Sequence, residues 1–258
     1  MRPTDVHPHA AIRTAFQPIV DLRDRSIYAY EALARGPEGE PAAWVFANTR
    51  DADDLGELDH TIRATAMRTA RRLLMKARLS VNLFAQSSGC PSASIHQTLQ
   101  DAAQQDFPYD QLIFEITESA EVWRPSRLNE FLDVHRAFGF KTAIDDFGVG
   151  YAGLKLLSCF RPDIIKLDMQ FTRHAPHDPR GRTMIRHMLA IAGELGCEVI
   201  AEGVETQEES DILSDLGIVR QQGYLFSVPM VDSLPLVHWP AALHTPGTPA
   251  PGRWGISL

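Results

Sequence analysis

Short apolar segments alternate with longer amphipathic stretches along most of the chain. Eight apolar segments that end in polar residues cover 14–20, 27–35, 79–85, 112–119, 142–148, 163–168, 198–205 and 221–227. Between most of them the apolar residues recur every three or four positions, as one face of a helix requires, for example in 57–77, 126–140 and 181–197. Strands that alternate with helices in this way predict an α/β fold, a (β/α)8 TIM-like barrel, which usually has about 250 residues.

The first two predicted strands are too close in sequence for a parallel connection. Only residues 21–26 separate them, whereas a parallel crossover needs about a dozen residues or more. We therefore expect a hairpin, so that the first strand of the barrel is antiparallel. We expect the barrel domain to span 15–243, preceded by an N-terminal arm at 1–14 and followed by a flexible tail at 244–258 that is rich in proline and glycine.

Composition narrows the class of protein. With 44% hydrophobic and 22% charged residues, the chain has enough apolar side chains for a large core, and a net charge of -8 argues against binding a nucleic acid polymer. No apolar run is long enough to cross a membrane, and the polar start lacks the apolar stretch of a signal peptide, so we expect a cytoplasmic protein without a membrane contact. Neither the three cysteines nor the ten histidines have a metal-binding spacing.

Polar residues close the predicted strands, at the edge where barrels of this type carry their chemistry. They are Glu31, Asn82, Glu115, Asp145, Asp146, Lys166, Asp168, Glu202, Glu205 and Gln222. Taken singly, such a residue is most often an exposed loop residue, and the stretch "DDFG" is most often a loop start in which one aspartate caps a helix. Six consecutive strands that end in acidic, amide or lysine side chains instead favour a site.

Asp145 and Asp146 are adjacent, although alternate residues of a strand face opposite sides. Both can reach one site only where the pleat ends, and Gly148 and Gly150 would give the backbone freedom for that turn. Crowded carboxylates repel each other unless cations neutralise them, and oxygen ligands suit magnesium or manganese. We interpret the two aspartates as neighbouring ligands of two divalent metal ions.

Other polar residues leave two interpretations open. Lys166 either forms a salt bridge with Asp168 or positions or deprotonates a water, with a pKa lowered by nearby cations. Arg35 is either a surface residue or a phosphate ligand. Gln17 and Gln222 either read the edge of a base or cap the barrel. Three aromatic residues near the rim are more often packing residues than stacking platforms, namely Phe147, Tyr151 and Tyr224.

Seven motifs occur in one order along the chain: "YEALARG", "VNL", "FEITES", "DDFGVGY", "IKLD", "AEGVET" and "QGYLFS". In these motifs the sequence resembles the EAL-domain family of cyclic di-GMP phosphodiesterases, which have a (β/α)8-like barrel with one inverted strand. The resemblance covers about Phe16 to Pro229. It implies metal-dependent hydrolysis of cyclic di-GMP to linear pGpG by two Mg2+ or Mn2+ ions. The alternative is a catalytically silent cyclic di-GMP receptor or protein-interaction module.

The resemblance also implies a role for each matching residue. The first metal would bind Glu31, Asn82, Glu115 and Asp145. The second would bind Asp145, Asp146 and Glu202, directly or through water. Lys166 would orient or deprotonate the attacking water, with Glu202 and Glu31 also in the catalytic group. Glu118 would anchor the loop after "DDFG". Substrate would contact Gln17, Arg35, Gln222 and Glu205.

Partners follow from the same resemblance. A homodimer is expected from the family, and the loop after "DDFG" reaches from the metal site towards the family's dimer interface. The sequence contains no recognisable sensory domain, so we expect any input signal to come from a separate sensory or regulatory protein, from dimerisation, or from chain outside this sequence.

Overall fold

The computed structural model describes residues 12–47, 52–83, 91–117, 134, 137–148 and 152–240. Several sequence predictions fall outside these residues and keep the status of expectations. They concern the loop anchor Glu118, Gly150, Tyr151, the tail at 244–258, most of the arm at 1–14 and most of the helix at 126–140.

A closed barrel of strands forms the centre of the described structure. Its strands are β1 (Arg13–Asp21), β2 (Ser26–Arg35), β3 (Arg78–Leu83), β4 (Leu112–Thr117), β5 (Lys141–Phe147), β6 (Ile164–Leu167), β7 (Glu198–Ala201) and β8 (Arg220–Gln222). They follow one another around the barrel from β2 to β8, and β1 lies between β8 and β2 and closes it.

Strand β1 runs against both of its neighbours. It pairs Phe16 with Ala32 of β2 and Ile19 with Gln222 of β8, whereas the pairs from β2 to β8 are parallel. The prediction of a (β/α)8 barrel with an antiparallel first strand is therefore confirmed. A short ninth strand, β9 (Met230–Val231), was not predicted; it pairs with the beginning of β1, beyond the point where β8 ends.

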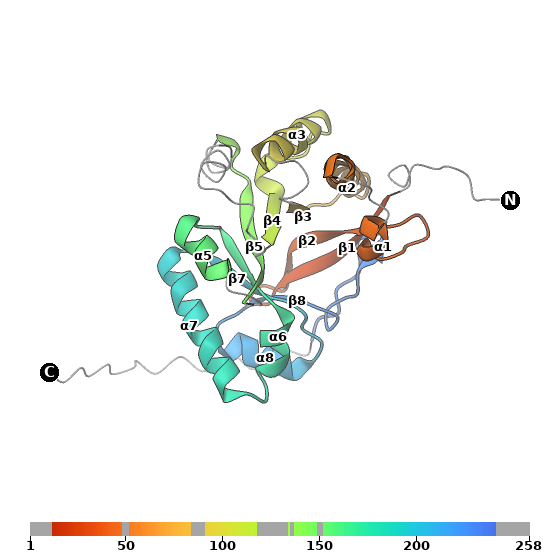
Figure 1. Ribbon diagram of the computed structural model, residues 1–258. Helices are drawn as coiled ribbons and strands as arrows, with labels where there is room; N and C mark the ends of the chain where they lie inside the picture. Colours follow the sequence, from red (N-terminus) through yellow and green to blue (C-terminus); the bar gives the residue numbers. More distant parts are fainter. Residues whose placement is uncertain are drawn as a thin grey trace.

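Helices cover the outside of this barrel (Figure 1). They are α1 (Ala42–Ala47), α2 (Ala52–Arg72), α3 (Pro91–Gln104), α5 (Ala152–Cys159), α6 (Met169–His174), α7 (Pro179–Leu195) and α8 (Gln207–Asp215), with a 3-10 turn, η2 (Tyr109–Gln111), before β4. The helices predicted at 57–77 and 181–197 correspond to α2 and α7, which begin and end a few residues earlier. Asp178 accepts a hydrogen bond from the backbone of Arg180 at the start of α7, and Gly196, with φ of 69°, ends that helix.

Apolar side chains pack on both sides of the sheet because strand residues alternate between its two sides. The larger cluster lies between the strands and the surrounding helices. A smaller cluster comprises Ile19, Tyr28, Ala29, Ile113, Ala143, Ile164 and Ile200. Six of its members, all except Tyr28, come from six different strands and lie on the inner side of the sheet. They fill the barrel interior below the rim.

Among the described residues, no helix is both long enough and apolar enough to cross a membrane.

Candidate active site

A layer of charged side chains lies directly above the apolar layer of the barrel interior. On five strands, a charged residue follows a buried apolar residue by two positions. The pairs are Ala29/Glu31, Ile113/Glu115, Ala143/Asp145, Ile164/Lys166 and Ile200/Glu202. The strand period is two, so both members of a pair point the same way along a regular strand. In the inverted β1 the polar residue, Gln17, comes two positions before Ile19 instead. The fold thus brings together the residues predicted from separate strand ends.

Lys166 occupies the centre of this layer, and its side chain is 1% exposed. Its Nζ lies 2.8 Å from Asp145 Oδ1, 2.8 Å from Glu202 Oε1, 2.9 Å from Glu115 Oε2 and 3.5 Å from Glu31 Oε2. Burial lowers the pKa of Lys166, but the surrounding carboxylates outweigh it and raise this pKa well above its usual value. The lysine is therefore charged. The sequence prediction was a pKa lowered by nearby cations, whereas the carboxylates of the structure raise this pKa.

The structure does not contain the salt bridge between Lys166 and Asp168 that the sequence left open. Asp168 is buried and caps helix α6, where its Oδ1 accepts a 2.8 Å hydrogen bond from the backbone nitrogen of Gln170. The two side chains have separate roles because Lys166 ends inside the barrel, whereas Asp168 already belongs to the start of the next helix.

The carboxylates around Lys166 carry more negative charge than one lysine can neutralise. Glu115 is 1% exposed and accepts a 2.6 Å hydrogen bond from Ser80 Oγ. Burial raises the pKa of Glu115 to about 8, although Lys166 acts to lower it. Burial also raises the pKa of Glu202 well above its usual value. Such groups either hold protons or bind further cations.

Asp145 and Asp146 reach the same site by a route other than the predicted one. Strand β5 continues through both residues to Phe147, and its pairing with β6 becomes irregular between Ile144 and Phe147. Asp146 itself has a left-handed backbone, with φ of 53°, which is a strained conformation for a residue other than glycine. The pleat is thus interrupted inside strand β5, whereas the turn was predicted after the end of the strand.

Three carboxylates at this point have the geometry of a cation site. One oxygen from each of Asp145, Asp146 and Glu202 lies within 4.8 Å of the other two. Burial, followed by the charges of Asp145 and Asp168, raises the pKa of Asp146 to about 6. Carboxylate oxygens are the ligands that Mg2+ and Mn2+ prefer, so this donor set fits the second of the two metal ions predicted from the sequence.

Two glutamines tie the acidic layer to the antiparallel strand. Gln222 Nε2 donates a 2.6 Å hydrogen bond to Glu31 Oε2 and lies 3.3 Å from Gln17 Oε1. Gln17 in turn donates to the backbone oxygen of Ser227 at 3.2 Å. Both side chains line the cavity described below, so the amides hold Glu31 in place and also face the space available to a ligand.

The remaining predicted residues surround this cluster. Asn82 lies beside Glu115, in register across β3 and β4, and is half-buried. Arg35 is half-buried as well; burial lowers its pKa, while the nearby Tyr224 and Glu31 act to raise it. Arg35 Nη1 donates a 2.8 Å hydrogen bond to the backbone oxygen of Ala34.

A cavity of about 300 Å3 opens above the acidic layer. It is lined by Gln17, Glu31, Asp145, Asp146, Asp168, Met169, Arg173, Glu202, Gly203, Glu205, Gln222, Gly223 and Tyr224. Its volume is at the lower end of the range of about 300–1,000 Å3 for ligand pockets. Arg173 was not predicted from the sequence, because it lies beyond a strand end on α6, and Tyr224 was interpreted as a packing residue. Tyr224 is instead 62% exposed at the mouth of the cavity.

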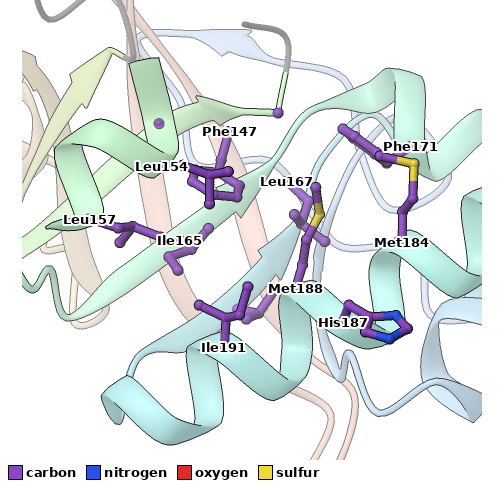
Figure 2. A pocket seen from close by; sticks show the side chains of 13 residues that line it. Phe147, Leu154, Leu157, Ile165, Leu167, Phe171, Met184, His187, Met188 and Ile191 are labelled. Carbon is purple, nitrogen blue, oxygen red and sulfur yellow. The ribbon is translucent and has the colours of Figure 1, made fainter. Parts of the chain in front are cut away.

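A second, apolar cavity of about 290 Å3 lies outside the barrel, behind the turn that follows Asp146. Figure 2 shows its wall, with Leu154 and Leu157 of α5 on one side and Met184, Met188 and Ile191 of α7 on the other. Leu154, Met184 and Ile191 are 63%, 50% and 40% exposed, so the apolar surface continues from the cavity to the outside of the protein.

Comparison with known proteins gives a consistent family assignment. The family model of the EAL domain matches residues 9–229. The chain is 31% identical over 227 residues to the blue light- and temperature-regulated antirepressor BluF of Escherichia coli, in a match that covers 88% of this chain and 56% of BluF. It is 30% identical over 226 residues to the cyclic di-GMP phosphodiesterase PA2567 of Pseudomonas aeruginosa, covering 84% of this chain and 38% of PA2567. The chain thus spans only part of the length of these relatives.

Two solved structures are similar in fold. A standalone versatile EAL protein from Vibrio cholerae, in its c-di-GMP bound form, has a TM-score of 0.83 and 35% identity, and the match covers 88% of this chain and 95% of that one. The manganese and cyclic di-GMP complex of BlrP1 from Klebsiella pneumoniae has a TM-score of 0.84 and 32% identity, with 93% of this chain and 61% of that one covered.

Proposed function

The chain belongs to the EAL domain family, and we propose that it is a metal-dependent phosphodiesterase that hydrolyses cyclic di-GMP to linear pGpG. In this reaction a water oxygen bonds to one phosphorus, the bond from that phosphorus to ribose O3′ breaks, and a proton goes to the leaving oxygen. Support comes from the relative named a cyclic di-GMP phosphodiesterase and from the similar structures that contain cyclic di-GMP.

The observation that carries the proposal is the excess of carboxylates over cations in the charged layer beneath the cavity. Four carboxylates face a single buried lysine, and three carboxylate oxygens lie within 4.8 Å of one another. A packed barrel has no structural need for this arrangement, because an unneutralised buried charge destabilises the fold. Two bound divalent ions would remove that cost.

The residues that would hold the metal ions follow from this arrangement. We assign the first ion to Glu31, Asn82, Glu115 and Asp145, and the second to Asp145, Asp146 and Glu202. Such ions provide a water of lowered pKa and positive charge for the phosphate being cleaved.

The protein side chains keep this site in order. Lys166, charged and fixed by its neighbours, would orient the attacking water, while Glu31 and Glu202 belong to the same catalytic group. Gln222 holds Glu31 by its 2.6 Å hydrogen bond. We assign substrate contacts to Gln17, Arg35, Gln222 and Glu205, which surround or line the mouth of the cavity.

Product analysis tests the proposal. The purified protein is incubated with cyclic di-GMP and Mg2+ or Mn2+, with and without a chelator, next to a Glu31→Ala variant whose fold is checked by circular dichroism. We expect pGpG only with metal and only from the unmodified chain. Metal-independent product, or undiminished turnover by the folded variant, would contradict the metal assignment.

A receptor or protein-interaction module is the second candidate. It is supported by the 31% identity to BluF, whose name describes an antirepressor. In the same experiment, tight binding of cyclic di-GMP without product under every metal condition would favour the receptor. A protein without binding or product would favour the interaction module, in which a separate regulatory protein is the partner.

We also propose that the chain forms a homodimer through the apolar surface shown in Figure 2. This surface carries the exposed Leu154, Met184 and Ile191. It adjoins Phe147 and Gly148, the start of the loop that reaches towards the dimer interface in the family. Light scattering coupled to size-exclusion chromatography measures the mass. A monomer at tens of micromolar would contradict this proposal.

A further inference from the structure

The cavity above the acidic layer contains very little positive charge. Of the described residues that line it, six are carboxylates and Arg173 is the one cation. Lys166 lies beneath the cavity and is already engaged by four carboxylates. Arg35, the last residue of β2, is not part of the lining.

Helix α6 fixes the position of Arg173. At its start, the side chain of Asp168 caps the helix at a point that borders the same cavity. At its end, Arg182 Nη1 donates hydrogen bonds of 2.7 Å and 3.0 Å to the backbone oxygens of Ala175 and Pro176. Phe171 packs on Gly148, where an added Cβ would lie 2.3 Å from the ring. The helix is thus held at its start, just after its end and at Phe171, and Arg173 lines the cavity.

Arg173 forms an ion pair with Glu205, which lines the same cavity. The two side chains are 47% and 43% exposed, so water screens their attraction and the pair contributes little to stability. An anionic ligand can therefore replace Glu205 as the partner of the Arg173 guanidinium at little cost in free energy. The planar fork of an arginine suits two phosphate oxygens.

We propose that Arg173 binds the second phosphodiester of cyclic di-GMP, the one that is not cleaved. The inference rests on the proposed function, because the metal ions would hold the first phosphodiester over Asp145 and Asp146. A cyclic dinucleotide carries its two phosphates on opposite sides of one ring, and among the described residues that line the cavity Arg173 is the cation left for the second negative charge. Arg173 makes the site selective for substrates with two phosphates.

The test compares two substrates that differ in phosphate number. Cyclic di-GMP has two phosphodiesters, and bis(p-nitrophenyl) phosphate has one. We expect Arg173→Ala to raise KM for cyclic di-GMP by about ten-fold or more while kcat changes little, as the loss of a hydrogen bond to a charged group predicts. Arg173→Lys should restore part of the affinity. Arg180→Ala, at an exposed arginine on α7, serves as the matched control and should behave like the unmodified chain.

The second substrate separates binding of phosphate from damage to the site. The value of kcat/KM for bis(p-nitrophenyl) phosphate should be unchanged in Arg173→Ala. An equal loss on both substrates, or no change on either, would overturn the assignment. If the unmodified chain hydrolyses neither substrate, the phosphodiesterase proposal fails, and calorimetry with cyclic di-GMP decides on Arg173. A Kd raised about ten-fold by Arg173→Ala would support the assignment, and an unchanged Kd or no binding would overturn it.

Discussion

Replacing Lys166 by methionine keeps an unbranched side chain as far as Cε and removes the ammonium at the centre of the acidic layer. The ammonium lies 2.8 Å from Asp145 and from Glu202. At an effective dielectric constant of about 20, each of these attractions is about 6 kcal/mol before desolvation is subtracted. Desolvation of the buried lysine and repulsion among the carboxylates offset much of this, and the removal of one partner from a buried ion pair typically costs about 3–5 kcal/mol.

We therefore expect the Lys166→Met variant to lose about 3–5 kcal/mol of unfolding free energy when a chelator is present. For a domain of this size the loss corresponds to a Tm about 6–20 °C lower. Thermal denaturation followed by circular dichroism measures it. Excess Mn2+ should restore part of the loss, since bound cations replace the missing positive charge in the same carboxylate cluster.

Lys141 provides a matched control at the other end of the barrel. Its Nζ lies 3.3 Å from Glu198, and the two side chains are 25% and 32% exposed. Lys141→Met should cost about 1 kcal/mol or less, as partly exposed ion pairs do. Equal losses in the two variants, or a Lys166→Met variant as stable as the unmodified chain, would refute the reasoning. The second result would mean that the carboxylates hold enough protons to make the lysine charge dispensable.

Two further predictions concern stability. Gly223→Ala should strongly destabilise the fold in urea titration, because the new Cβ would lie 2.0 Å from the backbone oxygen of Val204. Gly193→Ala is the matched control: its Cβ would meet no neighbouring atom within 4 Å. Because Gly193 lies in helix α7, this variant should gain about 1 kcal/mol of unfolding free energy. At Glu198, burial raises the pKa, but hydrogen bonds and nearby cations outweigh it and lower this pKa below its ordinary value. Its contribution is therefore present above the unfolded-state pKa and is lost as pH falls through the folded-state pKa. Urea titrations at pH 6 and pH 3 should show a smaller acid-induced loss in Glu198→Gln than in the unmodified chain or in the exposed control Glu194→Gln, and equal losses in all three would contradict it.

The sequence predicted the barrel and most of its polar layer because both depend on local repeats. The length between two apolar segments decides whether they can be parallel, which is why the inverted β1 was predictable. The period of two places Glu115 or Lys166 on the same side of its strand as the apolar residue before it. The connection length and the strand period were thus enough to predict the inverted strand and the polar residues at the strand ends, which the structure brings together.

Other features depend on contacts that no repeat encodes. The strained backbone of Asp146 lies inside a strand, and the letters "DD" are the same whether the irregularity comes before or after them. Arg173 lines the cavity from α6, a helix whose Phe171 packs against Gly148, and neither contact follows from a strand or helix period. The ninth strand has two residues, too few for a period to be seen.

The two ends of the barrel show how charge balance distinguishes a site from a structural network. At the end opposite the cavity, Glu198 lies 2.5 Å from the Tyr28 hydroxyl, 3.0 Å from Arg220 and 3.3 Å from Lys141. Cations there match or exceed the carboxylates they contact, and the pKa of Glu198 is lowered. At the cavity end four carboxylates share one lysine, and the pKa of Glu115 is raised to about 8. Both clusters look alike as groups of charged residues in the sequence. Only the second has a deficit of positive charge, and only a deficit gives a reason for divalent ions to bind there.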